Sequence, residues 1–130
     1  MAIKIIRIKP EFEDDRGGIA RVVEFDGLEI KSILRITSKK GSIRSNHYHK
    51  TDSHYIYIES GKMEYYERPA EDKEAELEKM TLVPGDLVYT APMVAHAVRF
   101  LEDSVIYAYT TETRDQKHYE KDTVRVTLIE

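Results

Sequence analysis

Apolar and polar residues alternate with a period of two along most of this chain, in short stretches rich in Val, Ile, Tyr and Thr. Gly, Pro and Asp residues separate the stretches, a pattern typical of β-strands joined by tight turns. The predicted strands cover residues 3–8, 18–25, 29–37, 42–49, 54–60, 62–68, 78–83, 87–91, 96–100, 104–111 and 123–129. So many short strands in 130 residues predict an all-β fold, either a barrel or a double-sheet jelly roll.

One charge-dense stretch interrupts the alternation. Residues 68–79, RPAEDKEAELEK, could form Glu–Lys pairs four positions apart on a short helix. They lie between two predicted strands, however, and this position favours a solvated loop over a functional helix.

Composition narrows the function classes. The chain is 41% hydrophobic and 34% charged, with a net charge of only −4, so no global field attracts nucleic acid or an acidic membrane. Cysteine is absent, which excludes disulfides, a thiolate nucleophile and cysteine zinc sites. No apolar stretch approaches the roughly 20 residues that cross a bilayer. We therefore expect a cytoplasmic protein with neither a nucleic-acid nor a membrane partner.

The stretch GSIRSNHYHKTDSHYIYIESG, residues 41–61, contains three histidines within eight positions. Side chains at i and i+2 of a strand share a face, so His47 and His49 project together. His54 begins the next strand and shares its face with Ile56 and Ile58, so a hairpin would bring it across from the pair. Imidazoles on an apolar interior need a hydrogen-bond partner or a metal.

A fourth histidine, His96, follows a Pro-containing turn and begins a strand in PGDLVYTAPMVAHAVRF. Neutral imidazole is a ligand for Zn, Ni, Fe, Cu and Mn. A His-x-His pair alone also occurs on ordinary strand surfaces, and a lone histidine before an apolar strand is more often structural. His118 lies in a polar segment and is predicted to be exposed.

Together these stretches resemble the two motifs of the cupin superfamily. The first motif corresponds to Gly41, five residues, His47-Tyr48-His49, four residues, His54, six residues and Gly61; the second corresponds to Gly85, Pro92 and His96. The resemblance implies a cupin double-stranded β-helix, a jelly-roll barrel, as a single domain over 1–130 with the barrel at about 28–111. It also implies a divalent metal ion (Zn, Ni, Fe or Mn) held by His47, His49, His54 and His96. His54 replaces the family's usual glutamate, which makes the site neutral and favours borderline metals.

The segment FEDDRGGIARVVEF (12–25) and the stretch after Gly41 resemble the opening of cupins that process deoxysugar nucleotides. Those are the dTDP-4-dehydrorhamnose 3,5-epimerases, the 3,4-ketoisomerases and the cupin domain of capsular sugar epimerases. The residues that carry this resemblance are Asp15, Arg16, Gly17, Arg44, Asn46, His47, His49 and Lys50. Ser45 stands where these proteins have glycine. The resemblance implies a nucleotide sugar as the small-molecule ligand in the barrel, and an isomerase or epimerase.

Epimerising or isomerising a keto sugar requires removal of a proton next to the carbonyl, and histidine can be the base. The candidate catalytic residues are His47, His49, Tyr89 and Tyr107, and the candidate substrate-binding residues are Arg35, Arg44 and Lys50. A metal on all four histidines would leave none as base, so the two uses compete.

Two other functions stay open: a different metal-dependent cupin enzyme, such as a dioxygenase or small isomerase, and a non-catalytic cupin that binds a small ligand or metal. Single-domain cupins commonly form homodimers, and the strands at 3–8 and 123–129 are the expected pairing edges.

Overall fold

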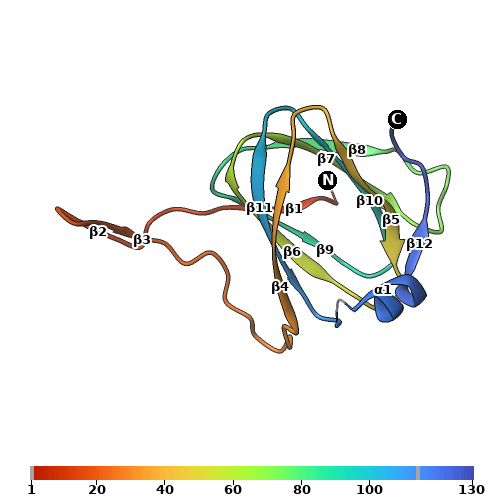
Figure 1. Ribbon diagram of the computed structural model, residues 1–130, viewed down its shortest axis with the longest axis horizontal. Coiled ribbons are helices and arrows are strands. Elements are labelled where there is room, and N and C mark those ends of the chain that lie inside the picture. Colours follow the sequence, from red (N-terminus) through yellow and green to blue (C-terminus); the bar gives the residue numbers. More distant parts are fainter. Residues whose placement is uncertain (1, 114) are drawn as a thin grey trace.

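The computed structural model describes residues 2–113 and 115–130 and shows two antiparallel five-stranded sheets packed face to face, with a separate two-stranded hairpin (Figure 1). The first sheet has the strand order β1-β9-β6-β11-β4, and the second has the order β12-β5-β10-β7-β8. Neighbouring strands in each sheet are mostly distant in sequence, as in a jelly roll. The all-β prediction is confirmed.

The elements are short. Their bounds are β1 Lys4–Arg7, β2 Phe12–Asp14, β3 Gly17–Ile19, β4 Ser32–Ser38, β5 Ile43–His49, β6 His54–Ser60, β7 Met63–Pro69, β8 Glu78–Leu82, β9 Asp86–Thr90, β10 Val94–Phe100, β11 Ser104–Thr110, α1 Gln116–Asp122 and β12 Thr123–Arg125. Strands β1 and β12 lie at sheet edges, as predicted for the N- and C-terminal strands.

The core lies between the two sheets and follows the alternation of the sequence. In β6, Ile56 and Ile58 are buried, whereas Tyr55 and Tyr57 face the other side of the sheet and are only partly buried. Met63, Tyr65, Leu82, Val98 and Phe100 fill the facing side from the second sheet. We call the side of the first sheet that is turned away from this core its outer face.

The glycine that ends the first histidine stretch is required by its surroundings. Gly61 has φ +93°, and a Cβ there would collide with the side chain of Ser104 and with the backbone of residues 103 and 104. Only glycine allows this left-handed turn between β6 and β7 to pack so closely against the loop before β11.

The structure corrects one predicted strand, adds a helix that was not predicted, and agrees with one predicted loop. The strand predicted at 18–25 is wrong beyond Ile19, because β3 ends there and residues 20–31 cross the molecule without regular structure. The helix α1 was not predicted, since it has seven residues, none of them buried. Residues 70–77 form a turn-rich loop between β7 and β8, as the loop interpretation of 68–79 expected.

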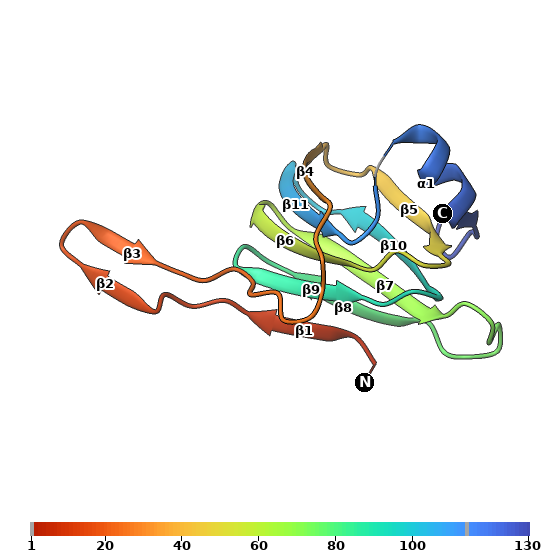
Figure 2. The ribbon, with the colours of Figure 1, turned by 90° about the horizontal axis from the view of Figure 1, so that it is seen from below.

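The hairpin β2–β3 projects away from the barrel in two perpendicular views (Figures 1 and 2). We call residues 9–21, which form this hairpin and its root, the arm. Every residue of the arm is exposed.

In the part of the chain that the structure describes, no helix combines the length and the apolar character needed to cross a bilayer.

Candidate active site

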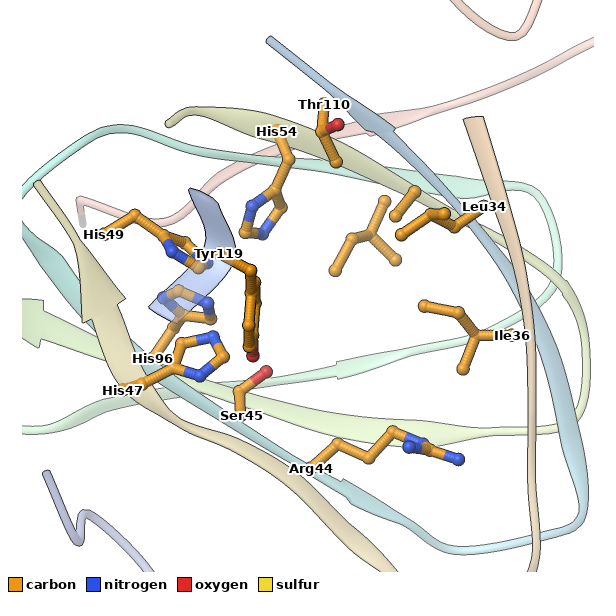
Figure 3. Close-up of a pocket in the computed structure, with 12 residues that line it drawn as sticks. Leu34, Ile36, Arg44, Ser45, His47, His49, His54, His96, Thr110 and Tyr119 are labelled. Atoms are coloured by element: carbon orange, nitrogen blue, oxygen red, sulfur yellow. The ribbon is translucent and has the colours of Figure 1, made fainter. Parts of the chain in front are cut away.

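The four motif histidines meet in one pocket at an end of the barrel, where β5, β6 and β10 come together (Figure 3). All four are buried, and His96 is only 1% exposed. His47 and His96 are directly paired across β5 and β10, so the inward face of both strands brings their rings together. Strand alternation and cross-strand register thus assemble the cluster.

A bulge in β5 positions the first two histidines. His96 pairs with His47 and Ala97 pairs with Ser45, so Asn46 is an extra residue on β5. Ser45 and Asn46 have φ values of 71° and 55°, in the left-handed region. The bulge lets Ser45 and His47 both line the pocket, while Asn46 turns outward.

The outward Asn46 fastens the C-terminal segment of the chain. Its Oδ1 accepts hydrogen bonds from the amides of Leu128 (3.0 Å) and Ile129 (3.2 Å), and its Nδ2 donates to the Ile129 carbonyl (3.0 Å). The amide of Val126 also donates to the Asn46 carbonyl. One bulge therefore both orients the histidines and holds residues 126–129 beside β5.

The ring spacing in the cluster suits a shared ligand. The centroids of His47 and His49 are 4.6 Å apart, those of His47 and His96 4.8 Å, and those of His54 and His96 5.1 Å. Ligand nitrogens of His47, His49 and His96 all lie within 4.8 Å of one another, as do ligand atoms of His49, Asp52 and His54. Three imidazoles converging in this way are a suitable donor set for a divalent ion of the zinc type.

His96 is held in one tautomer. Its Nδ1 is 2.9 Å from the carbonyl oxygen of Val94, which can only accept, so this nitrogen carries the proton and Nε2 does not. Burial lowers the pKa of His96 to about 4, outweighing the opposite effect of that hydrogen bond. His96 is therefore neutral at physiological pH, which is the form that binds a metal.

His49 is oriented by the C-terminal end of α1. Its Nδ1 is 3.2 Å from the hydroxyl of Thr123 and 3.7 Å from a carboxylate oxygen of Asp122. The Thr123 hydroxyl donates its one hydrogen to the carbonyl of Tyr119, so it accepts from His49. In the neutral ring this places the proton on Nδ1 and leaves the lone pair on Nε2.

Two carboxylates fix the loop between His49 and His54. Oδ1 of buried Asp52 accepts hydrogen bonds from the amide and hydroxyl of Thr111 and from the amide of Glu112. Burial raises the pKa of Asp52. Asp122 accepts from the amide and hydroxyl of Thr51 and from the amide of Asp52; these bonds hold its pKa below the usual value, although burial acts to raise it.

The pocket has a volume of about 150 Å³ and two unlike walls. The histidines form one wall, and Leu34 and Ile36 lie on the other (Figure 3). Ile56 and Ala108 add two further apolar side chains to the lining. Tyr119 of α1 stands beside the histidines, with its ring centroid 5.9 Å from that of His49. An engineered apolar cavity of similar size accepts benzene, so this pocket has room for one six-membered ring.

Comparison of the fold with solved structures finds two 3,4-ketoisomerases and a 3,5-epimerase among the similar proteins. A mutant of the sugar 3,4-ketoisomerase QdtA from Thermoanaerobacterium thermosaccharolyticum, in complex with TDP-4-keto-6-deoxyglucose, aligns with a TM-score of 0.74 at 21% identity, over 95% of this chain and 86% of that chain. A 3,4-ketoisomerase from Helicobacter canadensis aligns with a TM-score of 0.77 at 18% identity, over 96% of this chain and 91% of that chain. The dTDP-4-dehydrorhamnose 3,5-epimerase from Sulfolobus tokodaii aligns with a TM-score of 0.77 at 18% identity, over 98% and 78% of the two chains.

The protein has the cupin fold. No protein-family profile matches the sequence, and no curated protein matches it. At these sequence identities the structural likeness establishes the fold, the double-stranded β-helix. The chemistry has to be argued from the residues of the pocket.

The candidate site residues named in the sequence analysis lie in three different parts of the barrel. His47, His49, His54, His96 and Arg44 line the pocket. Lys50 lies at the rim, where its Nζ donates to the carbonyl of Lys121, at the end of α1.

The remaining three candidates, Arg35, Tyr89 and Tyr107, lie on the outer face of the first sheet. Their neighbours Leu34, Val88 and Ala108 take the inward positions, so alternation turns the three candidates away from the pocket. The exposure predicted for His118 is confirmed.

Sequence reasoning missed three residues that line the pocket or hold the loops around it: Tyr119, Asp52 and Asp122. The one available signal for Tyr119 and Asp122 was Asp115, which caps α1 by accepting a hydrogen bond from the amide of His118. An aspartate three positions before a histidine in DQKHYEKD is a helix-start pattern. Nothing in the segment shows, however, that the helix lies at the end of the barrel that holds the pocket, which we call the mouth.

Proposed function

We propose that this cupin is a sugar-nucleotide isomerase or epimerase that moves a proton at a carbon next to a keto group. The observation that carries the proposal is the arrangement of His49. Its Nδ1 faces Thr123 and Asp122, and its other nitrogen faces a ring-sized pocket beside Tyr119. Structural neighbours named as sugar 3,4-ketoisomerases and a 3,5-epimerase support the same class of reaction.

The chemistry follows from these groups. Nε2 of His49 accepts the proton from the carbon beside the carbonyl, and the electrons of that C–H bond form the enolate. The resulting imidazolium is stabilised by the Asp122 carboxylate. The Tyr119 hydroxyl donates a hydrogen bond to the developing oxyanion, and the proton returns to carbon at the same or the neighbouring position.

The two walls of the pocket favour a deoxysugar. The histidine wall suits the hydroxyl and keto groups of the ring, and the apolar lining by Leu34, Ile36, Ile56 and Ala108 suits an apolar substituent such as a methyl group. With about 150 Å³, the pocket holds the sugar ring alone, so the nucleotide must lie outside.

Arg44 supports a place for the diphosphate. It lines the histidine pocket and also a separate surface hollow of about 720 Å³ that includes Lys39 and Ser42. Ser38 and the Thr37 carbonyl hold its guanidinium by hydrogen bonds of 2.7 and 3.0 Å. A pre-positioned guanidinium between a sugar-sized pocket and a polar hollow matches the layout of a nucleotide sugar.

A second candidate, a metal-dependent cupin enzyme, is favoured by the converging nitrogens of His47, His49 and His96. These three residues, with His54 or Asp52 nearby, would hold a divalent ion. Such an ion supplies Lewis-acid polarisation of a carbonyl oxygen. Because His49 belongs to this set, it cannot be ligand through Nε2 and base at the same time.

The test is proton exchange at carbon. The protein is incubated with TDP-4-keto-6-deoxyglucose in D₂O, and deuterium next to the keto group is followed by NMR. We expect exchange by the wild type and a loss of about 10²–10⁴-fold for His49→Asn, the loss typical of a removed general base. The matched control, His118→Asn, changes an exposed histidine and keeps full exchange. Absence of wild-type exchange, with and without added Zn²⁺, would contradict the proposal.

The metal dependence of exchange and the metal content of the protein distinguish the two proposed functions, catalysis by His49 as base and catalysis by a bound metal. Exchange that survives chelation by EDTA supports His49 as base. Exchange that EDTA abolishes and Zn²⁺ restores, together with metal bound to the wild type and lost from His96→Ala by elemental analysis, favours the metal-dependent enzyme. Oxygen consumption with bound iron would instead indicate a dioxygenase. Metal binding or a thermal shift with TDP-sugars, without any turnover, would indicate a non-catalytic cupin.

A further inference from the structure

The pocket histidines come from both sheets of the barrel. His54 lies on β6 of the first sheet, whereas the other three lie on β5 and β10 of the second (Figure 3). Their separation therefore depends on how the two sheets are placed against each other, which apolar packing fixes only loosely because the hydrophobic effect has no direction. Hydrogen bonds are directional, so side-chain bonds between the sheets can fix the placement. One such bond, from Arg44 on β5 to Ser38 on β4, lies toward one edge of the sheets.

Three polar side chains form a second link between the sheets, inside the core and toward the opposite edge. Tyr65 on β7 donates a hydrogen bond of 2.9 Å to the carboxylate of Glu67, and its hydroxyl oxygen lies 2.5 Å from that of Thr90 on β9, in the other sheet. Tyr65 has one hydroxyl hydrogen and gives it to Glu67, so the hydroxyl of Thr90 is the donor in the second bond. All three residues are buried. We call them the inter-sheet link.

The inter-sheet link is adjacent to a histidine at each of its ends. In the first sheet, Thr90 pairs with His54 across β9 and β6. In the second sheet, Glu67 pairs with His96 across β7 and β10. Residues that lie directly opposite each other on neighbouring strands have Cβ atoms only about 4.5–5.5 Å apart. A closed path of neighbours therefore runs from His54 through Thr90, Tyr65 and Glu67 to His96, and the two histidine rings at its ends are 5.1 Å apart.

The inter-sheet link contributes geometry more than stability. Burial raises the pKa of Glu67, and burial together with the Glu67 carboxylate raises the pKa of Tyr65 well above its usual value. Tyr65 therefore keeps its proton and stays a hydrogen-bond donor at physiological pH. Apolar side chains of similar shape in place of a buried ionic or polar network often leave stability unchanged or raise it. A satisfied network nevertheless holds the surrounding core in one arrangement, which apolar side chains do less strictly.

We propose that Tyr65, Glu67 and Thr90 are positioning residues that fix the place of His54 relative to the histidines of the second sheet. Because the link ties β9 to β7 at this point, β6 cannot slide along the second sheet, and the ring of His54 stays 5.9 Å from that of His49. A displacement of about 1 Å in an active site costs on the order of 100-fold in rate. The effect on rate rests on the proposed function, whereas the effect on the position of His54 does not.

The first experiment measures the position of His54 without any ligand. Nuclear Overhauser effects between the rings of His54 and His96 are recorded by NMR on protein with ¹³C-labelled histidine. We expect a clear effect in the wild type. Tyr65→Phe keeps the ring and loses both hydrogen bonds, so the effect should weaken and the resonances of both histidines should shift. Thr90→Ser keeps the hydroxyl and should keep the wild-type signals. Ile58→Val, a buried change on the same strand as His54, is the second control and should keep them as well.

The second experiment separates positioning from stability. Tyr65→Phe alone takes a hydrogen-bond partner from two buried groups, so it should lower the melting temperature even if the link only stabilises the core. The triple variant Tyr65→Phe/Glu67→Leu/Thr90→Val removes all three polar groups together, and it should be at least as stable as the wild type in thermal unfolding. We expect it to show the displaced His54 all the same. Its rate of deuterium exchange into the sugar should fall on the order of 10–100-fold in kcat, with little change in KM.

Three results would count against the positioning role. Wild-type histidine signals and wild-type exchange in the triple variant would overturn it, because the link would then be dispensable for the pocket. Equal changes in Ile58→Val and Tyr65→Phe would overturn it too, since any loss of core stability would then have the same effect; this comparison also decides if the triple variant does not fold. A displaced His54 with unchanged exchange would overturn the effect on rate. If the wild type exchanges no deuterium, the proposed function fails, and the histidine signals still decide the position of His54.

Discussion

Aspartates hold two turns of this protein by the same means, in very different surroundings. Asp14 accepts hydrogen bonds from the amide and guanidinium of Arg16 at the tip of the arm, where the surrounding residues are exposed. Asp52 accepts from two backbone amides and a hydroxyl at the barrel mouth, where it is only 3% exposed. Water can replace the partners of Asp14 at little cost, but it cannot reach those of Asp52.

The comparison shows how burial changes what a hydrogen-bonded turn can hold in place. Buried donors that lose their acceptor stay unsatisfied, so the mouth keeps one arrangement and can hold a catalytic geometry. The exposed bonds of the arm shape a turn without fixing its position relative to the barrel. The mouth is therefore better suited than the arm to presenting fixed side chains to a ligand.

The largest expected effect is that of Asp52→Ala. It leaves the buried amides of Thr111 and Glu112 without their acceptor, which should lower the free energy of unfolding by about 2–3 kcal/mol in urea titrations. Asp52→Asn keeps an oxygen for the same three bonds and removes a charge that burial disfavours, so its loss should be smaller. Asp14→Ala should leave the melting temperature unchanged; equal losses at both sites would show that burial does not distinguish the two turns.

Asn46 is partly buried, so the effect of its substitution on stability should lie between those at Asp52 and Asp14. Asn46→Ala removes three hydrogen bonds to the C-terminal segment and places alanine in the left-handed region, with an expected loss of about 1–2 kcal/mol. Asn46→Gly removes the same bonds without the backbone strain. The difference between the two variants in chemical denaturation measures the strain, and a larger loss for the glycine variant would refute the strain as a contributor.

Asp122 should make the mouth sensitive to acid. Hydrogen bonds from Thr51 and Asp52 hold its pKa below the usual value in the folded state, so its ionisation stabilises the fold above about pH 4, near the unfolded pKa. That contribution is lost as the pH falls through the folded pKa. Asp122→Asn should therefore be less stable than the wild type at pH 7, with a gap in melting temperature that narrows below about pH 4. A gap independent of pH would contradict this account.

The smallest expected effect is that of Ser45→Gly. Serine at φ 71° is strained and glycine is not, but glycine also loses more backbone freedom on folding. We expect a net gain of about 0.5 kcal/mol by differential scanning calorimetry. A marked destabilisation would indicate that the Ser45 side chain itself holds the bulge.

The alternation of the sequence was sufficient to predict most of the barrel. It placed Ile56 and Ile58 inside, Tyr55 and Tyr57 outside, and His47, His49 and His54 on one inward face, because strand parity is a local property. The same rule could have excluded Tyr107 and Arg35 from the pocket, since each neighbours an inward residue that the alternation identifies.

Other features depend on contacts that no local pattern records. Residues 18–25 have the composition of a strand, yet pairing stops at Ile19, which lies opposite Phe12, the first residue of the antiparallel partner strand β2. Helix α1 is short and polar, and it matters because Thr51 and His49 contact its C-terminal end. The bulge at Asn46 follows from the register between β5 and β10, which sequence alone does not give.

The order of strands in the first sheet has a consequence for how the chain folds. Strand β4 has only β11 as a neighbour, and β11 lies between β4 and β6. Residues Ser32–Ser38 must therefore wait for Ser104–Thr110, whereas the hairpin β7–β8 can form locally. Pairings between distant segments slow folding, so this barrel should close late and in one cooperative step. During that interval β4 and β6 have unpaired edges. Aggregation with other newly made chains is therefore most favoured before β11 pairs with them.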